Sequence, residues 1–372
     1  MAQHIYVDNA ATTRLDPDAL EAMKPFLLED YGNPSQPYAF ARKTKNALAK
    51  ARTTIAECIG ARPEEIFFTS GGTESDNWAL KCFGPEGADR KVITSTIEHH
   101  AVLNASKGAV RLPVDVKGVV SSEALQKALA VDDRTGRPTL VSVMLVNNEI
   151  GTIEPICELA DAAHAYGAYF HTDAVQALGH ISVNVNELGV DMLSASAHKF
   201  NGPKGVGFLY VRKGTPLRPF MDGGAQEAQH RAGTENVAGI VGMAVALKKN
   251  CDEMWETATK LRTMESAFFD TLSHTDVDFV RNGSEHRMPG NISISIRGVS
   301  GEMLLHRLDL KGISISTGSA CDSVNTQVSH VIQAIGVQQE YAKGTIRVSF
   351  GRDNKSNDAV AVAKAIEMVY LG

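Results

Sequence analysis

The stretch SASAHKFNGPKGVG, residues 194–207, carries the strongest indication of fold and chemistry in this chain. His198 and Lys199 stand side by side in it, after the apolar run DMLSAS (191–196) and before a turn rich in glycine. A lysine usually lies at the protein surface with its ammonium group in water. Small residues and glycines flank Lys199. The segments before and after this stretch indicate whether Lys199 is a surface residue or part of a functional site.

Runs typical of strands alternate with helical patterns on both sides of this stretch. Residues 16–60 look helical, with Asp16 as the cap, Pro17 at the first helical position and an end near Gly60. The strand-like runs cover residues 65–69, 91–95, 139–146, 168–172, 191–196 and 205–211. This alternation predicts an α/β fold, a mostly parallel sheet flanked by helices, with the ligand at the carboxyl ends of the strands.

The pattern changes in the last third of the chain. Residues 237–274 predict one long, bent helix, which marks a domain boundary. Strand-like runs and helical patterns then follow up to a closing helix from residue 356. We expect a large domain over residues 16–257 and a smaller α+β domain made of residues 1–15 and 258–372.

Composition limits the classes of function. The chain has 372 residues and a formal net charge of -6, so it has no general attraction for nucleic acid or an anionic membrane, and we expect it to bind neither. The start MAQHIYVDNA lacks the pattern of a signal peptide, and no run of eighteen apolar residues occurs, which predicts a cytoplasmic location. Five cysteines without a CxxC pair argue against a disulfide framework, and we expect no metal site.

Polar residues follow several of the predicted strands, and each has an ordinary explanation when taken alone. The glycine-rich segment SGGTESDN (70–77) is suited to bind phosphate at a helix N-terminus, but it is also a simple capping turn. His99, in EHHA, has no ligand at zinc spacing and is more often a structural residue. Asp173 leaves an apolar strand, and a buried aspartate needs a cation.

Binding of pyridoxal phosphate would explain all of these residues at once. Lys199 would bind the cofactor covalently as a Schiff base. The segment SGGT (70–73), Ser196 and His198 would bind its phosphate group. His99 would stack on the pyridine ring, and Asp173 would pair with the ring nitrogen. Each motif is weak alone, but their order on successive strand ends favours this cofactor.

Motifs along nearly the whole chain support the same interpretation. They are YVDNAATT (6–13), YGNPS (31–35), TSGGTESDN (69–77), EHHA (98–101), NNEIGTIEPI (147–156), DAVQALG (173–179), SAHKFNGPKGVGFLYVR (196–212), GGAQE (223–227), RAGTENVAGIVG (231–242), STGSAC (316–321) and IRVSFGR (346–352). With them the chain resembles the NifS/IscS-type cysteine desulfurases, which are class V, fold type I pyridoxal-phosphate enzymes. It departs from that family at Tyr38, where a histidine is usual, and at Asp322, just after Cys321.

The resemblance implies a set of site residues. The cofactor site it implies consists of Gly72, Thr73, His99, Asn148, Asp173, Gln176, Ser196, His198, Lys199 and Thr234. Gln176 would hydrogen-bond the phenolic oxygen of the cofactor, and Thr234 would reach the phosphate of the neighbouring subunit in a homodimer. Asn33, Asn148 and Arg347 would bind the substrate, L-cysteine.

Catalysis by such an enzyme would use Lys199, His99 and Cys321. Lys199 would move the α-proton of L-cysteine, and the thiolate of Cys321 would take the sulfur as a persulfide, leaving L-alanine. An acceptor protein would then receive the sulfur, for iron–sulfur cluster assembly, tRNA thiolation or another sulfur modification. The other four cysteines stand in helical contexts and are expected to be packing residues.

Three alternatives remain open at this point. A selenocysteine lyase or a class V aminotransferase would also need Lys199, but a transaminase has no use for Cys321. A scaffold that binds sulfur-transfer partners without catalysis would need neither residue.

Overall fold

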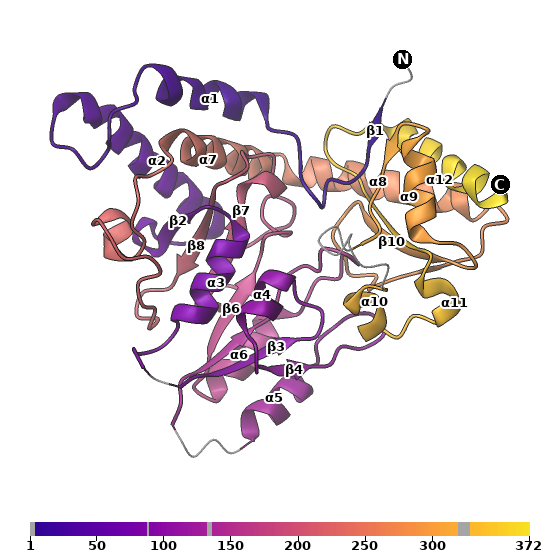
Figure 1. Cartoon of the computed structure of the whole chain (residues 1–372), viewed down its shortest axis with the longest axis horizontal. Helices are drawn as coiled ribbons and strands as arrows, with labels where there is room; N and C mark the ends of the chain where they lie inside the picture. The colour runs from indigo at the N-terminus through magenta and orange to yellow at the C-terminus, as the bar shows by residue number, and fades with distance from the viewer. Residues whose placement is uncertain (1–3, 88, 132–135, 319–327) are drawn as a thin grey trace.

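A seven-stranded sheet forms the centre of the protein in the computed structural model, which describes residues 4–87, 89–131, 136–318 and 328–372. Its strand order is β2 (Ile66–Thr69), β8 (Gly207–Val211), β7 (Met192–Ser196), β6 (Tyr169–Asp173), β5 (Thr139–Ser142), β3 (Lys91–Ser95) and β4 (Val110–Leu112). Neighbours pair in parallel except at β8, which is antiparallel to both β2 and β7. The predicted α/β fold with a mostly parallel sheet is confirmed (Figure 1).

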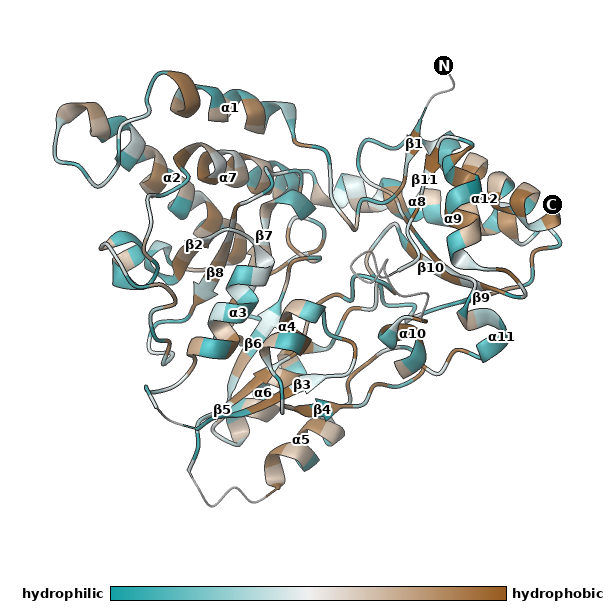
Figure 2. Ribbon diagram, viewed as in Figure 1, coloured by the Kyte–Doolittle hydropathy of each residue, from teal (hydrophilic) through white to brown (hydrophobic). Residues whose placement is uncertain are grey.

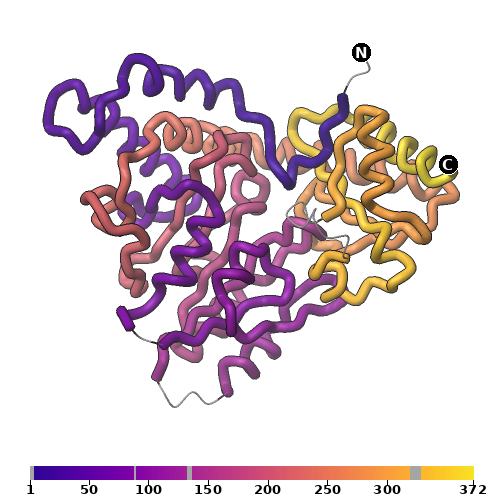
Figure 3. Tube along the Cα trace, in the orientation of Figure 1, coloured from indigo at the N-terminus to yellow at the C-terminus, as the bar shows by residue number. Residues whose placement is uncertain are grey.

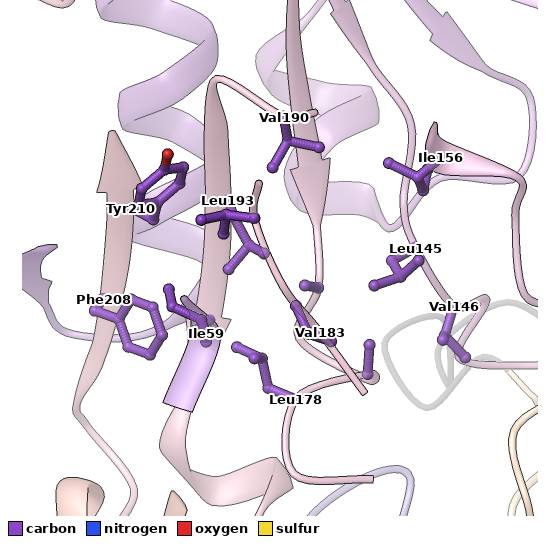
Figure 4. Packing of buried hydrophobic residues seen from close by; sticks show 14 of the residues in the cluster. Ile59, Leu145, Val146, Ile156, Leu178, Val183, Val190, Leu193, Phe208 and Tyr210 are labelled. Atoms are coloured by element: carbon purple, nitrogen blue, oxygen red, sulfur yellow. The ribbon is translucent and has the colours of Figure 1, made fainter. Parts of the chain in front are cut away.

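Helices cover both faces of this sheet because consecutive residues along its strands are apolar, so that both faces require burial. Phe68 and Leu193 pack in one core, while their neighbours Phe67 and Met192 pack in the other. The first core includes α2 (Arg42–Ile59), α5 (Ser122–Ala130), α6 (Ile156–Ala165) and α7 (Val237–Asp252), and the second includes α3 (Gly72–Cys82) and α4 (His100–Ala105). Figure 4 shows Ile59 of α2 against the strand residues Leu193, Phe208 and Tyr210. The strands are mostly apolar in Figure 2, as burial on both faces requires.

The N-terminal helical region starts and ends as predicted but is not continuous. Asp16 caps α1 (Pro17–Leu28) by accepting hydrogen bonds from the N–H groups of Asp18 and Ala19, and Gly60 ends α2 with a φ of 70°. Between Leu28 and the 3₁₀ helix η1 (Ala39–Ala41) the chain forms a loop. Asn33 bends this loop by accepting a hydrogen bond from the Ser35 N–H, and Pro34 disfavours a helical conformation at the residue before it.

The long bent helix predicted for residues 237–274 is two helices. α7 ends at Asp252 and α8 (Met254–Leu272) starts after Glu253, whose backbone φ and ψ of -93° and 3° leave the helical range. α8 and α12 (Ser356–Leu371) pack on a sheet of order β12 (Thr345–Ser349), β10 (Asn291–Ile296) and β9 (Phe279–Arg281). α9 (Gly301–Asp309) completes this second core.

The N-terminal segment joins the two halves of the molecule. β1 (Ile5–Tyr6) pairs in parallel with β11 (Ile313–Ser314), so the start of the chain lies beside its C-terminal part (Figure 3). Residues 10–13 then return to the central sheet, where Thr13 donates to the carbonyl of His198. None of the helices in the described ranges is long and apolar enough to cross a membrane.

Candidate active site

A cavity of about 310 Å³ lies at the carboxyl ends of the parallel strands, as the fold predicts. Most of the predicted cofactor and substrate residues line it: Gly72, Thr73, His99, Asn148, Asp173, Gln176, Ser196, His198, Lys199 and Arg347. They come from α3, the segments after β3, β5, β6 and β7, and β12. Tertiary structure therefore brings together side chains up to 275 positions apart, from Gly72 to Arg347.

Lys199 ends the 3₁₀ helix η3 (Ala197–Lys199), directly after β7. Its Nζ donates to the carbonyl oxygens of Ala10, at 2.6 Å, and Ala11, at 2.8 Å. Gln176 Nε2 donates to the same Ala10 oxygen at 3.0 Å. The N-terminal segment thus closes one side of the cavity, and Lys199 is a site lysine rather than a surface one.

The N-terminus of α3 forms one end of the cavity, and its glycines are sterically required. No side chain caps α3, whose N-cap is Gly71 at a φ of 151°, so the simple capping turn is excluded for Thr73. A Cβ atom on Gly72 would lie 2.6 Å from Val175 Cγ2, and one on Gly207 would lie 2.7 Å from Gly71 Cα. Close backbone approach leaves first-turn N–H groups facing the cavity with the hydroxyls of Thr73 and Ser196, an arrangement suited to phosphate.

Burial sets the charge of His99 and Asp173, the two residues predicted to contact the cofactor ring. It lowers the pKa of His99 to about 4, helped by nearby Lys199, so His99 is neutral at pH 7. Because His99 Nδ1 accepts from the Ala101 N–H at 3.1 Å, its proton is on Nε2. Burial raises the pKa of Asp173 to about 6, against a hydrogen bond from the Val175 N–H and the charge of Lys199. Asp173 is thus an anion at pH 7 that a cationic ring nitrogen would stabilise.

Arg347 lies at the opposite end of the cavity and is only 2% exposed. Its Nη2 pairs with Asp8 Oδ1 at 2.7 Å, and its Nη1 donates to the carbonyl oxygen of Asn148 at 2.8 Å. Its Nε is buried without a hydrogen-bond partner. A guanidinium group that lines a cavity is suited to bind a carboxylate.

The sequence analysis missed two buried carboxyl groups beside Asp173. Asp76, in α3, is fully buried, and burial followed by the charge of Asp173 raises its pKa well above the usual value. Its Oδ1 has no hydrogen-bond partner and lies 3.7 Å from His171 Nε2. Burial raises the pKa of Glu98 to about 8. Both stand inside quoted motifs, but only the fold shows that they line the cavity rather than face solvent.

Two predicted residues do not line the cavity that the described residues form. Thr234 is exposed in the segment before α7, and Asn33 lies in the loop after α1. Cys321, with Asp322, lies outside the described residues. Gly318 and His330, on either side of that segment, both line the cavity.

A larger cavity of about 700 Å³ lies between α6 and α8. It is lined by Cys157 and Trp255 among others, but by none of the predicted site residues. The smaller cavity is therefore the candidate active site.

Comparisons with known proteins agree with this site. The family model described as aminotransferase class-V matches residues 5–362. Cysteine desulfurase IscS of Dictyoglomus turgidum is 47% identical over 379 aligned residues, which cover 99% of this chain and 95% of that protein. A solved NifS-like protein superposes with a TM-score of 0.91 at 38% identity, over 99% of this chain and 100% of its own.

A solved structure of SspA in complex with cysteine superposes with a TM-score of 0.79 at 32% identity, over 93% of this chain and 98% of its own. The match to class V spans the sheet, the cavity and the C-terminal part of the chain. The chain is thus a member of the class V aminotransferase family and, within it, of the cysteine desulfurases.

Proposed function

We propose that this protein is a pyridoxal-phosphate-dependent cysteine desulfurase. It converts L-cysteine into L-alanine and transfers the sulfur, as a persulfide on Cys321, to an acceptor protein. The observation that carries this proposal is that Lys199, Asp173, His99 and Arg347 face a single cavity. The names of the cysteine desulfurase relatives and the cysteine-bound SspA structure support L-cysteine as the substrate.

The donor set of the cavity fits pyridoxal phosphate. A helix N-terminus with Thr73 and Ser196 suits the phosphate, neutral His99 suits the face of the ring, and buried Asp173 suits the ring nitrogen. When bound, the cofactor supplies an electron sink that makes the α-proton of an amino acid acidic. Lys199 attaches the cofactor and, once released, is the base that moves this proton.

Arg347 orients the substrate. Its guanidinium group, which lines the cavity, binds the α-carboxylate of L-cysteine. Asn148 adjoins it, since the Asn148 carbonyl oxygen accepts from Arg347 Nη1. The thiol of the substrate then points toward the side of the cavity where Gly318 and His330 lead to the segment with Cys321.

Cys321 takes the sulfur as a thiolate. Its Sγ attacks the substrate sulfur, so an S–S bond forms and the bond between Cβ and sulfur breaks. The electron pair of the broken bond stays on the substrate carbon, which takes a proton and leaves as alanine. The sulfur stays on Cys321 as a persulfide until an acceptor thiolate attacks it.

We also propose a cytoplasmic homodimer in which Thr234 reaches the phosphate of the partner subunit. The exposure of Thr234 on a segment away from its own cavity supports this arrangement. The division into residues 16–257 and residues 1–15 with 258–372 stays a prediction, as does Asn33 as a substrate contact. β1 pairs with β11, which is compatible with a small domain that includes the N-terminus.

Anaerobic incubation with L-cysteine tests the proposal. Alanine is quantified and the persulfide is mapped by mass spectrometry for the wild type, Cys321→Ala, Lys199→Ala and the control Cys157→Ala, which removes an exposed cysteine on α6. We expect alanine and one extra sulfur on Cys321 in the wild type and the control, and neither product in the other two variants. Alanine that survives Cys321→Ala would indicate a lyase, and alanine that forms only with a keto acid would indicate an aminotransferase.

A further inference from the structure

Three consecutive residues in the segment before Thr234 have a left-handed backbone. Glu227, Ala228 and Gln229 have φ angles of 45°, 54° and 67°, and they are three of the four non-glycine residues with positive φ in the described part of the chain. An L-residue seldom adopts this conformation, because its Cβ atom comes too close to the following carbonyl oxygen. Such strained residues persist where the surrounding structure holds them, and they are concentrated at functional sites. This left-handed turn, residues 227–229, is therefore a candidate positioning element.

A buried ion pair holds the first residue of the left-handed turn. Glu227 is only 8% exposed, and its carboxylate accepts two hydrogen bonds from Arg52 of α2, at 2.9 Å from Nη1 and 2.7 Å from Nη2. Its Oε2 also accepts from the N–H of Phe68 at 3.0 Å. Phe68 belongs to β2, the edge strand of the central sheet, and the Arg52 guanidinium lies over its ring, 4.2 Å from the centroid. Two parallel charge-assisted hydrogen bonds fix both the position and the orientation of Glu227.

A second ion pair fixes the segment to the helix on the other face of the sheet. Arg231 donates from Nε to Glu74 Oε1 at 2.8 Å and from Nη2 to Glu74 Oε2 at 3.2 Å. Glu74 lies in the first turn of α3, directly after Thr73 at the phosphate end of the cavity. Because α2 and α3 pack in cores on opposite faces of the sheet, the segment from Glu227 to Arg231 is held from both faces.

One more hydrogen bond connects the left-handed turn to Thr234. The side-chain oxygen of Gln226, the residue before Glu227, accepts from the N–H of Gly233 at 3.2 Å. Gly233 directly precedes Thr234, whose side chain is exposed. The place of this exposed hydroxyl is thus set by the anchored residues before it.

We propose that Arg52 is a positioning residue for the cofactor site of the partner subunit. Through Glu227 it holds the left-handed turn, and the turn places the Thr234 hydroxyl where it donates to the phosphate bound by the other protomer. Without Arg52 the turn relaxes toward a less strained backbone, and Thr234 moves away from that phosphate. The inference rests on the proposed homodimer in which Thr234 reaches the partner's phosphate, and it names the residues that make this contact possible.

Cofactor affinity tests the proposal without relying on turnover. Pyridoxal phosphate is titrated into cofactor-free protein, and the visible absorbance of the lysine-linked cofactor gives the affinity. We expect Arg52→Ala and Thr234→Ala to bind about tenfold more weakly than the wild type. Lys50→Ala, which removes an exposed cation from the same helix, should bind normally. Normal affinity of Thr234→Ala would contradict the proposed dimer contact and this inference with it, whereas normal affinity of Arg52→Ala alone would overturn only this inference.

Mixed dimers distinguish the placement of Thr234 from damage within the altered protomer. A dimer of one Arg52→Ala and one Lys199→Ala protomer, isolated with two affinity tags, has a single site with a lysine. Under the proposal this site receives Thr234 from the protomer whose Arg52 is intact, so it should bind pyridoxal phosphate with wild-type affinity. Affinity as weak as that of the Arg52→Ala homodimer would show that Arg52 supports its own protomer, and the absence of any dimer would contradict the proposed function as well.

A glycine in the left-handed turn tests whether strain is what Arg52 offsets. Ala228→Gly puts at the φ of 54° a residue that has no Cβ atom and adopts this backbone readily. In the Arg52→Ala background it should recover part of the lost cofactor affinity. Ala225→Gly, at an ordinary φ of -80°, is the matched control and should recover none. Equal affinities with and without Ala228→Gly would show that the strain argument is wrong, and circular dichroism checks that each variant folds.

Discussion

The Nζ atom of Lys199 lies 2.6 Å from the carbonyl oxygen of Ala10. This contact joins the central sheet to the segment that returns from β1, and it holds the amine at the edge of the cavity. A second carbonyl oxygen, that of Ala11, also accepts from Nζ. Two backbone carbonyl groups thus fix the position of the lysine amine.

Arg347→Gln should weaken substrate binding while leaving the cofactor bound. Because we propose that the Arg347 guanidinium, which lines the cavity, binds the substrate carboxylate, we expect kcat/KM for L-cysteine to fall roughly 100-fold, mainly through KM. Steady-state alanine formation measures this, and the visible absorbance of the lysine-linked cofactor should not change. Arg307→Gln, at an exposed position of α9, is the control. An unchanged KM would remove Arg347 from the substrate site.

Asp76 and Asp173 should respond differently to replacement by asparagine. Burial and the charge of Asp173 raise the pKa of Asp76, so we expect Asp76→Asn to change cofactor affinity less than about threefold, as replacement of a neutral carboxyl group would. Asp173→Asn removes the anion that faces the ring nitrogen and should lower both affinity and turnover by roughly 100-fold or more. Cofactor titration followed by absorbance gives the affinities. A loss with Asp76→Asn as large as that with Asp173→Asn would show that Asp76 is ionised.

The phosphate end of the cavity should not tolerate a Cβ atom at Gly72. Gly72→Ala places a methyl group 2.6 Å from Val175 Cγ2, so the turn must move and cofactor affinity should fall about tenfold. The double variant Gly72→Ala with Val175→Ala frees this space and should recover most of the affinity. If the second substitution gives no recovery, the steric explanation is wrong.

Glu154 should make the cofactor-free protein less stable as pH rises. Burial raises its pKa to about 8, so between pH 5 and 8 the folded state binds a proton that the unfolded state has lost, and the free energy of unfolding falls with pH. Glu154→Gln should reduce this fall by roughly 1–3 kcal/mol, measured by urea unfolding at pH 5 and pH 8. Glu158→Gln, exposed on α6, should not change it. An unaltered pH dependence in Glu154→Gln would mean that Glu154 is ionised when folded.

Local patterns in the chain were enough for the fold class and for much of the site. Asp16, Pro17 and Gly60 marked helix boundaries because capping depends on only a few neighbouring residues. These boundary residues did not mark the loop after Leu28, where Asn33 and Pro34 turn the chain, or the break at Glu253. Lys199 and Asp173 were identifiable because a charged residue directly after an apolar strand is unusual.

By itself, the sequence determined the order of strands and helices, the pyridoxal-phosphate motif set and the family, because these depend on residue type and short spacing. Only the tertiary structure decided that Asp76 and Glu98 line the cavity and that the Ala10 carbonyl accepts a hydrogen bond from Lys199. Each of these contacts joins positions distant in the chain, and burial, which sets pKa values, is a property of the packed molecule rather than of any segment.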